Sequence, residues 1–241
     1  MLESSDSGVP EILARVKSAL VTGGSSGIGL ALARMLRDEG YELTLVARRP
    51  EPLAAAASEL GAEAVSANLA DGEECVRVVS AHGERWGGMD VLVNSAGLGV
   101  GGSFADQDTK RIGLQLDVNL RATMLVTRES LPLLRASRGQ IVTISSIAGT
   151  IPTPGLAVYA ATKAALNSFT NSLNREEADH GVRATAICPA FVATRMTDWT
   201  DIAPEEMIQL EDVVELVRTV LHLSPRARVP QIVIERVGDA A

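Results

Sequence analysis

The sequence predicts an α/β fold with one doubly wound parallel sheet of about seven strands and helices on both faces. Three observations predict it. Short runs rich in Val, Ile and Leu recur along the chain, as expected of buried strands. Segments with helical spacing separate most of these runs, which favours right-handed crossovers between parallel strands. No linker-like segment interrupts the chain between residues 15 and 237, so we expect one folded domain over 15–237 after a flexible leader over 1–14.

Seven apolar runs are the candidate strands. Each is short, and each is rich in the branched side chains that favour strands. In chain order they are SALVT (18–22), ELTLVA (42–47), EAVSA (63–67), VLVN (91–94), QIVTISS (140–146), VRATAIC (182–188) and QIVIE (231–235). The clearest helical pattern between them is IGLALARMLRDEG (28–40), which ends on Gly40, a residue type that commonly ends helices.

Composition and charge exclude several classes of function. The 241 residues are 46% hydrophobic and 22% charged, which is typical of a folded domain. The net charge of -8 disfavours nucleic acid and anionic membranes as partners. The chain starts with an acidic, polar stretch instead of a signal peptide and has no apolar run of about 18 residues, so we expect a cytoplasmic location.

The cysteines and histidines predict neither disulfides nor metal sites. Cys75 and Cys188 are far apart and are expected to be small buried apolar residues. His82, His180 and His222 lack the spacing of metal ligands. We expect these histidines at the surface or in loops and predict no metal.

The first expected strand leads into TGGSSGIG (22–29) and then into a helix. Glycines permit positive φ and close backbone approach, and a helix N-terminus offers free N–H groups to a phosphate. The glycine spacing, at Gly23, Gly27 and Gly29, is neither G-x-G-x-x-G nor a Walker loop. The alternative is a plain tight turn, but such a turn rarely needs four glycines. The pattern favours a dinucleotide phosphate site.

Further motifs follow in a fixed order. They are NSAG (94–97), Asn119 in LDVNL, ISSIAG (144–149), YAATK (159–163) and CPAFVAT (188–194). Together with the glycine turn, this ordered set resembles the short-chain dehydrogenase/reductase family over about residues 15 to 237. The resemblance implies a Rossmann-like fold and an oxidoreductase. Ser95 and Ala190 depart from the family's N-N-A-G and P-G-x-V-x-T patterns, but neither change removes a reacting side chain.

The residue that ends the second strand indicates which dinucleotide binds. In dinucleotide-binding folds an acid about 20 residues past the glycines binds the ribose 2′-hydroxyl of NAD, and an Arg nearby accommodates the 2′-phosphate of NADP. Arg48 lies 19 residues after Gly29, and Arg49 follows it. A guanidinium fork suits phosphate oxygens. We therefore predict NADP(H), with NAD(H) the less favoured cofactor; the alternative is that both arginines are ordinary solvated charges.

The resemblance also implies which residues contact the cofactor. Asn68 occupies the place of an adenine-contacting Asp, while Val192 and Thr194 match contacts to the nicotinamide amide and phosphate. The full expected set is Gly23, Ser25, Ser26, Ile28, Arg48, Arg49, Asn68, Leu69, Asn94, Ala96, Gly97, Tyr159, Lys163, Pro189, Val192 and Thr194.

Tyr159 and Lys163 are the expected reacting pair. Residues four apart share one helix face. A tyrosine has an ordinary pKa of about 10, and a nearby ammonium stabilises the phenolate and lowers that pKa. Tyr159 would then act as general acid in reduction and general base in oxidation. The alternative for the isolated pattern is a polar pair on a helix surface.

A serine and an asparagine complete the expected catalytic group. Ser145 and Ser146 end a strand, and the carboxyl ends of strands line ligand crevices in such sheets. A hydroxyl there donates to a substrate oxygen as charge develops. Ser146 lies 13 residues before Tyr159, as the family's serine does, so the resemblance implies that Ser146 is the catalytic serine. We expect Ser145 to face the sheet or a neighbouring backbone. The resemblance gives Asn119 a structural and proton-relay role.

The residues around this group predict an apolar substrate pocket. They are Ile147, Ile151, Pro152, Leu156, Phe191, Met196 and Trp199, with Arg195 as the possible cation. By resemblance, the segment of about 190–210 is a mobile substrate loop. The closing PRARVPQIVIERVG lacks the family's D-G-G ending, so no fatty-acid or sugar specificity is carried over.

The expected function is NADPH-dependent reduction of a ketone or aldehyde to an alcohol, a reversible reaction. Two alternatives remain: an NAD-linked alcohol, hydroxysteroid or sugar-alcohol dehydrogenase, and a non-catalytic dinucleotide sensor. Arg48 argues against the first, and the intact Ser146, Tyr159 and Lys163 argue against the second. The resemblance implies a homodimer or homotetramer that pairs through helices, including segment 159–178.

Overall fold

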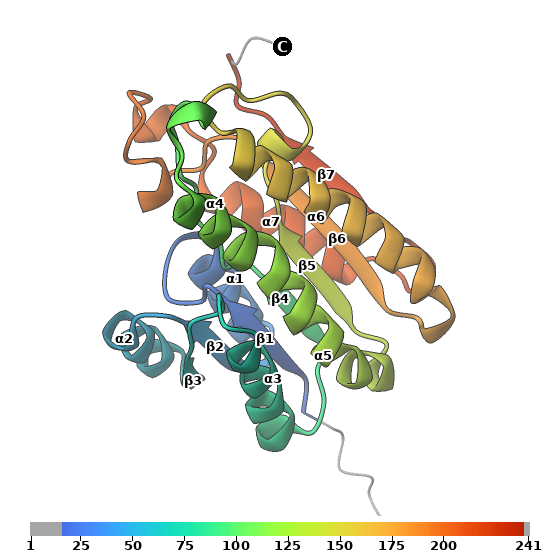
Figure 1. The fold of residues 1–241 in the computed structure, drawn as a ribbon. Helices are drawn as coiled ribbons and strands as arrows, with labels where there is room; N and C mark the ends of the chain where they lie inside the picture. Colours follow the sequence, from blue (N-terminus) through green and yellow to red (C-terminus); the bar gives the residue numbers. More distant parts are fainter. Residues whose placement is uncertain (1–15, 239–241) are drawn as a thin grey trace, which may run out of the picture.

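The structure is a computed structural model that describes residues 16–238; the leader expected over 1–14 lies outside them. Seven strands form one all-parallel sheet in the order β3-β2-β1-β4-β5-β6-β7, and helices pack on both of its faces (Figure 1). The predicted doubly wound α/β fold is confirmed.

The strands follow the apolar runs closely. Their bounds are β1 Ser18–Thr22, β2 Glu42–Ala47, β3 Glu63–Ser66, β4 Val91–Asn94, β5 Gln140–Ile144, β6 Arg183–Pro189 and β7 Gln231–Ile234. The main difference is at β5, which ends before Ser145 and Ser146. There the chain turns into a short 3-10 helix, η3 (Ile147–Gly149), whose N-cap is Ser146. Its hydroxyl accepts a hydrogen bond from the Ala148 N–H at 3.1 Å.

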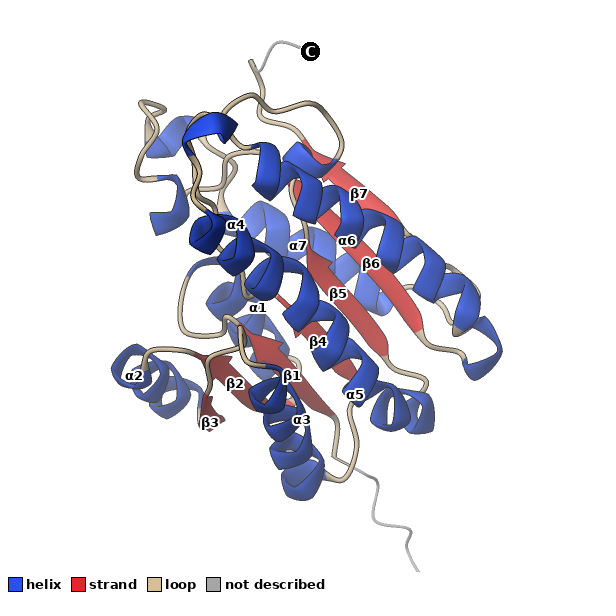
Figure 2. Ribbon diagram, viewed as in Figure 1, coloured by secondary structure: helices blue, strands red, loops and turns tan. Residues whose placement is uncertain are grey.

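The helices fill the intervals between strands (Figure 2). They are α1 Gly27–Asp38, α2 Pro50–Leu60, α3 Gly72–Trp86, α4 Thr109–Gln115, α5 Ala122–Ser137, α6 Ala157–Glu176 and α7 Leu210–His222. A π-helix, η2 (Leu116–Arg121), joins α4 to α5. Local sequence sets several ends: α2 begins with a proline and ends on a left-handed Gly61, and the Asp71 carboxylate caps α3 by accepting from the Glu73 N–H.

Two hydrophobic clusters hold the three layers together. In Figure 1, α3, α4, α5 and α6 lie in front of the sheet, and α1 and α7 lie behind it. Side chains alternate between the faces along each strand. Thus Val21 and Val93 pack in the cluster with α1, α2 and α7, whereas their neighbours Leu20 and Leu92 pack in the cluster with α3 and α5. All four are 0% exposed, so the central strands are rigidly fixed.

The strand order places a ligand crevice. The chain builds outward from β1 through β2 to β3, then returns to β4 on the other side of β1 and continues to β7. At such a switch point the loops after neighbouring strands diverge, which leaves a crevice at the carboxyl ends. The loops after β1 and β4 carry TGGSSGIG and NSAG.

One histidine contradicts the prediction that the histidines lie at the surface or in loops. His82 lies in α3 and is 0% exposed. Its Nδ1 is 2.8 Å from the Thr44 Oγ1, and its Nε2 is 3.0 Å from the Gly88 carbonyl oxygen. Burial lowers the pKa of His82 to about 4. The expectation of a surface position was wrong because buried acceptors and hydroxyls satisfy both ring nitrogens; His180 and His222 are exposed.

The remaining predictions from composition concern cysteines, metals and membranes. Cys75 and Cys188 are both buried free thiols, as predicted. Within residues 16–238, no group of three or more His, Cys, Asp or Glu side chains is arranged to hold a metal ion. None of the described helices has the length and apolar character needed to cross a membrane.

Candidate active site

A large cleft of about 1900 Å³ opens at the carboxyl ends of the strands. It gathers segments that are far apart in the sequence, from the glycine turn after β1 to the loop after β6. The predicted site residues that line it are Gly23, Ser25, Ser26, Ile28, Arg49, Ala96, Gly97, Ser146, Tyr159, Lys163, Pro189, Val192 and Thr194. Those outside its lining are Arg48, Asn68, Leu69, Asn94 and Asn119.

The glycine turn has a geometry that only glycine permits. Gly23 has φ +68°, and a Cβ there would lie 2.9 Å from the backbone of Ser95 and Ala96. A Cβ on Gly29 would lie 2.4 Å from the Gly23 carbonyl oxygen. The turn therefore packs against the NSAG segment with no room for a side chain, and the free N–H groups at the start of α1 border the cleft.

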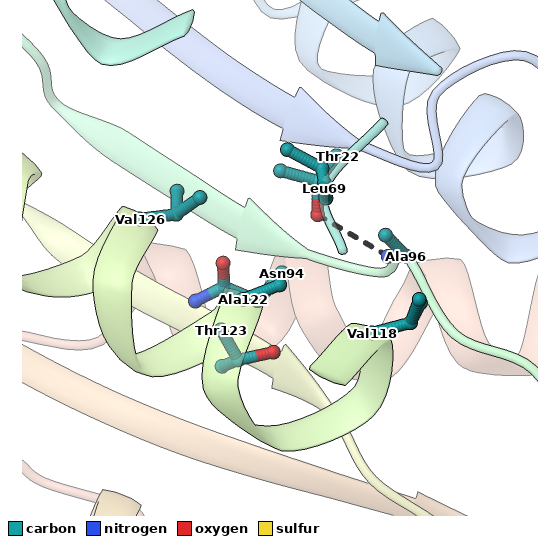
Figure 3. A pocket seen from close by; sticks show the side chains of 8 residues that line it. All are labelled: Thr22, Leu69, Asn94, Ala96, Val118, Ala122, Thr123 and Val126. Atoms are coloured by element: carbon teal, nitrogen blue, oxygen red, sulfur yellow. Dashed lines mark hydrogen bonds between the residues drawn. The ribbon is translucent and has the colours of Figure 1, made fainter. Parts of the chain in front are cut away.

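Thr22, which the sequence analysis did not single out, joins these two segments. Its Oγ1 accepts hydrogen bonds from the backbone N–H groups of Ser95 at 3.1 Å and Ala96 at 3.2 Å. Figure 3 shows the bond to Ala96 beside a small pocket. The only signal in the sequence was a hydroxyl at the carboxyl end of the first strand.

The small pocket explains where Leu69 and Asn94 lie. Both line it together with Ala96, and Val118 from the π-helix faces it from the other side (Figure 3). The Asn94 Nδ2 donates to the Thr127 Oγ1 at 3.0 Å, which ties β4 to α5. Its Oδ1 is buried and has no hydrogen-bond partner among the described residues. Val118 also escaped the sequence analysis, because an apolar residue in a helix carries no distinguishing signal.

The arginines after β2 are free to meet an anion. Arg48 and Arg49 are both exposed, and neither forms an ion pair within residues 16–238. Arg49 lines the cleft, whereas Arg48 is not among the lining residues. Asn68 is exposed, and its Oδ1 accepts from the Ala70 N–H at 3.4 Å, a long contact within its own turn.

Tyr159 and Lys163 share one face of α6, as predicted. The Lys163 Nζ lies 5.5 Å from the centroid of the Tyr159 ring. Lys163 is only 4% exposed, and its Nζ donates to the Ile144 carbonyl oxygen at 2.7 Å. Burial lowers the pKa of Lys163 to about 8. The ammonium is thus held at the end of β5, under the cleft.

The pKa of Tyr159 differs from the expectation. Burial raises this pKa above its ordinary value, and a hydrogen bond with Ser146 only partly opposes the rise. We predicted that Lys163 lowers the pKa of Tyr159. That prediction was wrong, because removal of water from the phenolate is the larger effect. The Lys163 ammonium is directed at a carbonyl oxygen, and the nearby Ser146 side chain is the group that acts to lower the pKa of Tyr159.

Close packing of η3 on α6 brings Ser146 to Tyr159. A Cβ on Gly149 would lie 2.6 Å from the Lys163 carbonyl carbon, so the two backbones touch there. The Ser145 Oγ donates to the Lys163 carbonyl oxygen at 3.1 Å. The Ser145 hydroxyl therefore faces a neighbouring backbone, as expected. Both serines line the cleft, but Ser145 is 3% exposed, whereas Ser146 is half-buried.

Asn119 lies beneath the cleft in the π-helix and is 0% exposed. Its Oδ1 accepts from the Leu98 N–H at 2.8 Å, and its Nδ2 donates to the Leu98 carbonyl oxygen at 2.8 Å and to the Thr162 Oγ1 at 3.2 Å. It thereby joins the loop after β4 to α6. π-Bulges are frequent at functional sites, and this one turns a helical amide toward a loop backbone.

Gln115 is a second buried amide, and the sequence analysis missed it. It is 0% exposed; its Oε1 accepts from the Val100 N–H at 3.3 Å, and its Nε2 donates to the Gln107 Oε1 at 3.2 Å. The bonds hold the glycine-rich segment 97–102, which forms one wall of the cleft. The glycines alone could have signalled that wall, but nothing in the sequence identified its amide support.

The other wall is apolar. Seven predicted side chains line it, namely Ile147, Ile151, Pro152, Leu156, Phe191, Met196 and Trp199, and Arg195 borders it. The segment after β6 is fixed at its base by the bridge between Val192 and Ile208. Between these two residues it extends over the mouth of the cleft.

Comparison with known proteins identifies relatives of this chain. The sequence profile described as short chain dehydrogenase matches residues 17–203. An uncharacterized oxidoreductase of Staphylococcus epidermidis is 35% identical over 230 residues, covering 93% of this chain and 100% of the relative. One of Staphylococcus aureus is 31% identical over 225 residues, covering 92% of this chain and 97% of the relative.

Solved structures show the same fold with dinucleotides bound. A short chain dehydrogenase from Burkholderia cenocepacia in complex with NADP is 30% identical, has a TM-score of 0.84 and matches over 93% of this chain and 98% of its own. An alcohol dehydrogenase from Thermococcus sibiricus with 5-hydroxy-NADP is 27% identical, with a TM-score of 0.86 over 93% of this chain and 98% of its own. An actinorhodin polyketide ketoreductase with NADPH is 30% identical, with a TM-score of 0.83 over 91% of this chain and 95% of its own.

Proposed function

The chain belongs to the short-chain dehydrogenase family, and on that premise we propose an NADPH-dependent oxidoreductase that reduces a ketone or aldehyde to an alcohol, reversibly. One observation carries the proposal: the side chains of Ser146, Tyr159 and Lys163 line one dinucleotide-sized cleft, and the buried Lys163 Nζ lies 5.5 Å from the centroid of the Tyr159 ring. Ser146, Tyr159 and Lys163 therefore form the proposed catalytic group.

The residues at the cleft fit a dinucleotide phosphate. Gly23 and Gly29 leave no space for a Cβ, and the start of α1 provides unpaired N–H groups to a pyrophosphate. Arg48 and Arg49 provide uncommitted guanidinium groups for a 2′-phosphate. Three of the structural neighbours hold NADP(H) or a derivative, which supports NADP(H) over NAD(H).

The other predicted contacts divide among three parts of the cofactor. Ser25, Ser26 and Ile28 would hold the pyrophosphate in the middle. The adenosine end would meet Asn68, Leu69, Asn94, Ala96 and Gly97, and the nicotinamide end would meet Pro189, Val192 and Thr194. When bound, the nicotinamide supplies a hydride to the carbonyl carbon or accepts one from the alcohol.

The side chains of this chain handle the proton and the charge on oxygen. The raised pKa of Tyr159 keeps the phenol protonated, so it can donate its proton to a substrate oxygen that gains charge during reduction. The Ser146 hydroxyl donates a second hydrogen bond to the same oxygen and stabilises that charge. The Lys163 ammonium then offsets the charge left on the phenolate. By family resemblance, Asn119 would hold a water that connects to the lysine.

Two alternatives make different predictions. An NAD-linked dehydrogenase would place an acid near the end of β2, but Arg48 and Arg49 stand there. A non-catalytic dinucleotide sensor would need only the glycine turn. It gives no reason for Ser146 and Tyr159 to line the same cleft beside a buried lysine.

An absorbance assay at the NADPH wavelength tests the proposal. The wild-type protein is offered NADPH or NADH with a panel of ketones and aldehydes, and Tyr159→Phe is compared with Tyr41→Phe. Tyr41 is the other tyrosine of the chain and lies at the start of β2, away from the cleft. We expect turnover with NADPH, a loss of at least about 100-fold in kcat for Tyr159→Phe and little change for Tyr41→Phe.

Three outcomes would contradict the proposal. Full turnover by Tyr159→Phe would remove the phenol from the mechanism. Tight NADPH binding without turnover on any carbonyl compound would favour the sensor, and a clear preference for NADH would favour the NAD-linked alternative.

The assembly is a further part of the proposal. Family resemblance implies a homodimer or homotetramer that pairs through helices, including segment 159–178, most of which is α6. We propose that α5 adds to this interface. Met124 on α5 is 37% exposed, which leaves apolar surface on that helix. Sedimentation velocity tests the assembly, and a monomer at micromolar concentration would contradict it.

A further inference from the structure

We infer that the substrate is an uncharged aryl ketone or aldehyde whose ring packs against Trp199. This inference rests on the proposed reductase function and specifies its substrate class. Three observations support it: an aromatic pair at the mouth of the cleft, an excess of exposed apolar surface around that mouth, and the lack of a buried charge on the substrate wall.

The aromatic pair is formed by Phe191 and Trp199. Their ring centroids are 6.1 Å apart with an interplanar angle of 65°, an edge-to-face arrangement. Aromatic rings prefer such geometry, and a third ring can add to it by stacking or by another edge contact. The chain has only seven aromatic residues (two Trp, two Tyr and three Phe), and three of them, Tyr159, Phe191 and Trp199, line this one cleft.

The mouth of the cleft exposes large apolar side chains. Trp199 is 67% exposed, Ile151 is 52% exposed and Met196 is 48% exposed. All three line the cleft, from two different loops. Apolar groups gathered around one concave site commonly mark a binding surface, because a ligand removes them from water.

The segment that carries Trp199 is anchored at its base. The Ala193 N–H donates to the Ile208 carbonyl oxygen, and the Ile208 N–H donates to the Phe191 carbonyl oxygen, both at 2.9 Å. The Thr197 Oγ1 donates to the Val192 carbonyl oxygen at 2.8 Å. Phe191 is therefore fixed beside the end of β6, and Trp199 packs on it from the exposed part of the segment.

The charges near this wall disfavour an ionic substrate. Arg195 and Glu235 border the cleft here, but both are exposed, and their charges are opposite. Lys163 is committed to the Ile144 carbonyl oxygen, and Arg49 lies at the far end, after β2. A buried cation that could hold a carboxylate is therefore absent from the described wall, and a charged group on the substrate would lose water without a partner.

Matched substrates and variants test the inference. The panel is acetophenone, cyclohexyl methyl ketone, 4-acetylbenzoate and 4-(aminomethyl)acetophenone, measured with the wild-type protein, Trp199→Ala and Phe104→Ala. Phe104 is the control. Its side chain is 62% exposed, a fraction similar to the 67% of Trp199, but it does not line the cleft. We expect acetophenone to have the highest kcat/KM, and Trp199→Ala to lower that value roughly 10- to 100-fold.

The comparison between ring types gives the sharpest outcome. We expect Trp199→Ala to affect acetophenone more than cyclohexyl methyl ketone, and Phe104→Ala to affect neither. Equal values for these two ketones in the wild-type protein, or a preference for either charged ketone, would overturn the inference while leaving the reductase function in place.

Fluorescence separates this inference from the proposed function. The chain has two tryptophans, so Trp86→Phe leaves Trp199 as the single reporter. Titration with acetophenone in the presence of NADP should quench its emission. If Trp86→Phe does not fold, the quenching difference between the wild-type protein and Trp199→Phe gives the same information.

The combined readouts assign each failure. Quenching without turnover on any carbonyl compound would refute the reductase and keep the aromatic site. Turnover without quenching, and with Trp199→Ala unaffected, would refute the aromatic site and keep the reductase.

Discussion

His82 should make the stability of the protein depend on pH in a defined window. The folded protein holds this ring neutral, because burial lowers the pKa of His82 from 6.5 to about 4. As the pH falls below about 6.5, the unfolded chain binds a proton that the folded protein excludes. The stabilisation from His82 is therefore fully present above about pH 6.5 and is lost as the pH falls toward 4.

The size of the effect follows from the shift. A difference of one pKa unit corresponds to about 1.4 kcal/mol, so the full shift of His82 corresponds to about 3.4 kcal/mol. At pH 4.5 most of the unfolded chain is protonated at this position, and about 2.5 kcal/mol of the stabilisation is gone. For a protein whose net stability is about 5 to 15 kcal/mol, this is a large fraction.

Urea unfolding between pH 7.5 and 4.5 measures this loss of stability. Carboxylates also titrate in this range. Their contribution cancels when the change in the free energy of unfolding with pH in His82→Gln is subtracted from that in the wild-type protein. Glutamine keeps a donor and an acceptor for Thr44 and Gly88 but does not titrate. We expect the wild-type protein to lose about 2.5 kcal/mol more than this variant, and the exposed His180→Gln to behave as wild type. If the free energy of unfolding changed with pH in the same way in all three proteins, the reasoning would be refuted.

Three further predictions concern the cleft. Gly29→Ala should abolish NADP binding measured by calorimetry, because its Cβ would lie 2.4 Å from the Gly23 carbonyl oxygen; unchanged affinity would contradict the turn geometry. In carbonyl reduction, kcat/KM should fall above about pH 8 as Lys163 loses its proton, and a Lys163→Met profile that keeps the same inflection would assign it elsewhere. Gln115→Leu should raise KM more than it lowers kcat, because it frees the Val100 N–H of the cleft wall, and an unchanged KM would contradict this support.

Much of the fold could be predicted because buried parallel strands leave a direct trace in the sequence. β1, β2 and β4 coincide with the apolar runs 18–22, 42–47 and 91–94. The end of β5 was harder to place, because Ser145 and Ser146 continue the run and only the N-capping role of Ser146 stops it. Periodicity reports burial, whereas a cap depends on a hydrogen bond that a pattern of side chains does not encode.

Parts of the site escaped prediction for a related reason. Thr22, Gln115 and Val118 act through the backbone or through a partner that lies far away in the sequence, so nothing local marks them. The environment of His82 was missed in the same way, because Thr44 and Gly88 reach it only after folding. The pKa of Tyr159 was predicted from its neighbour Lys163, but its direction depends on how much water folding removes from the phenol.

The division between what was and was not predictable has a functional meaning. Lys163 is 4% exposed and Asn119 is 0% exposed, so the side chains proposed for the reaction rest on the core and tolerate little variation. Trp199 and Met196, at 67% and 48% exposed, add little to the core, so replacing them costs the fold little. The motifs of the sequence therefore indicate the reaction, whereas only the arrangement of exposed side chains on the segment after β6 indicates the substrate.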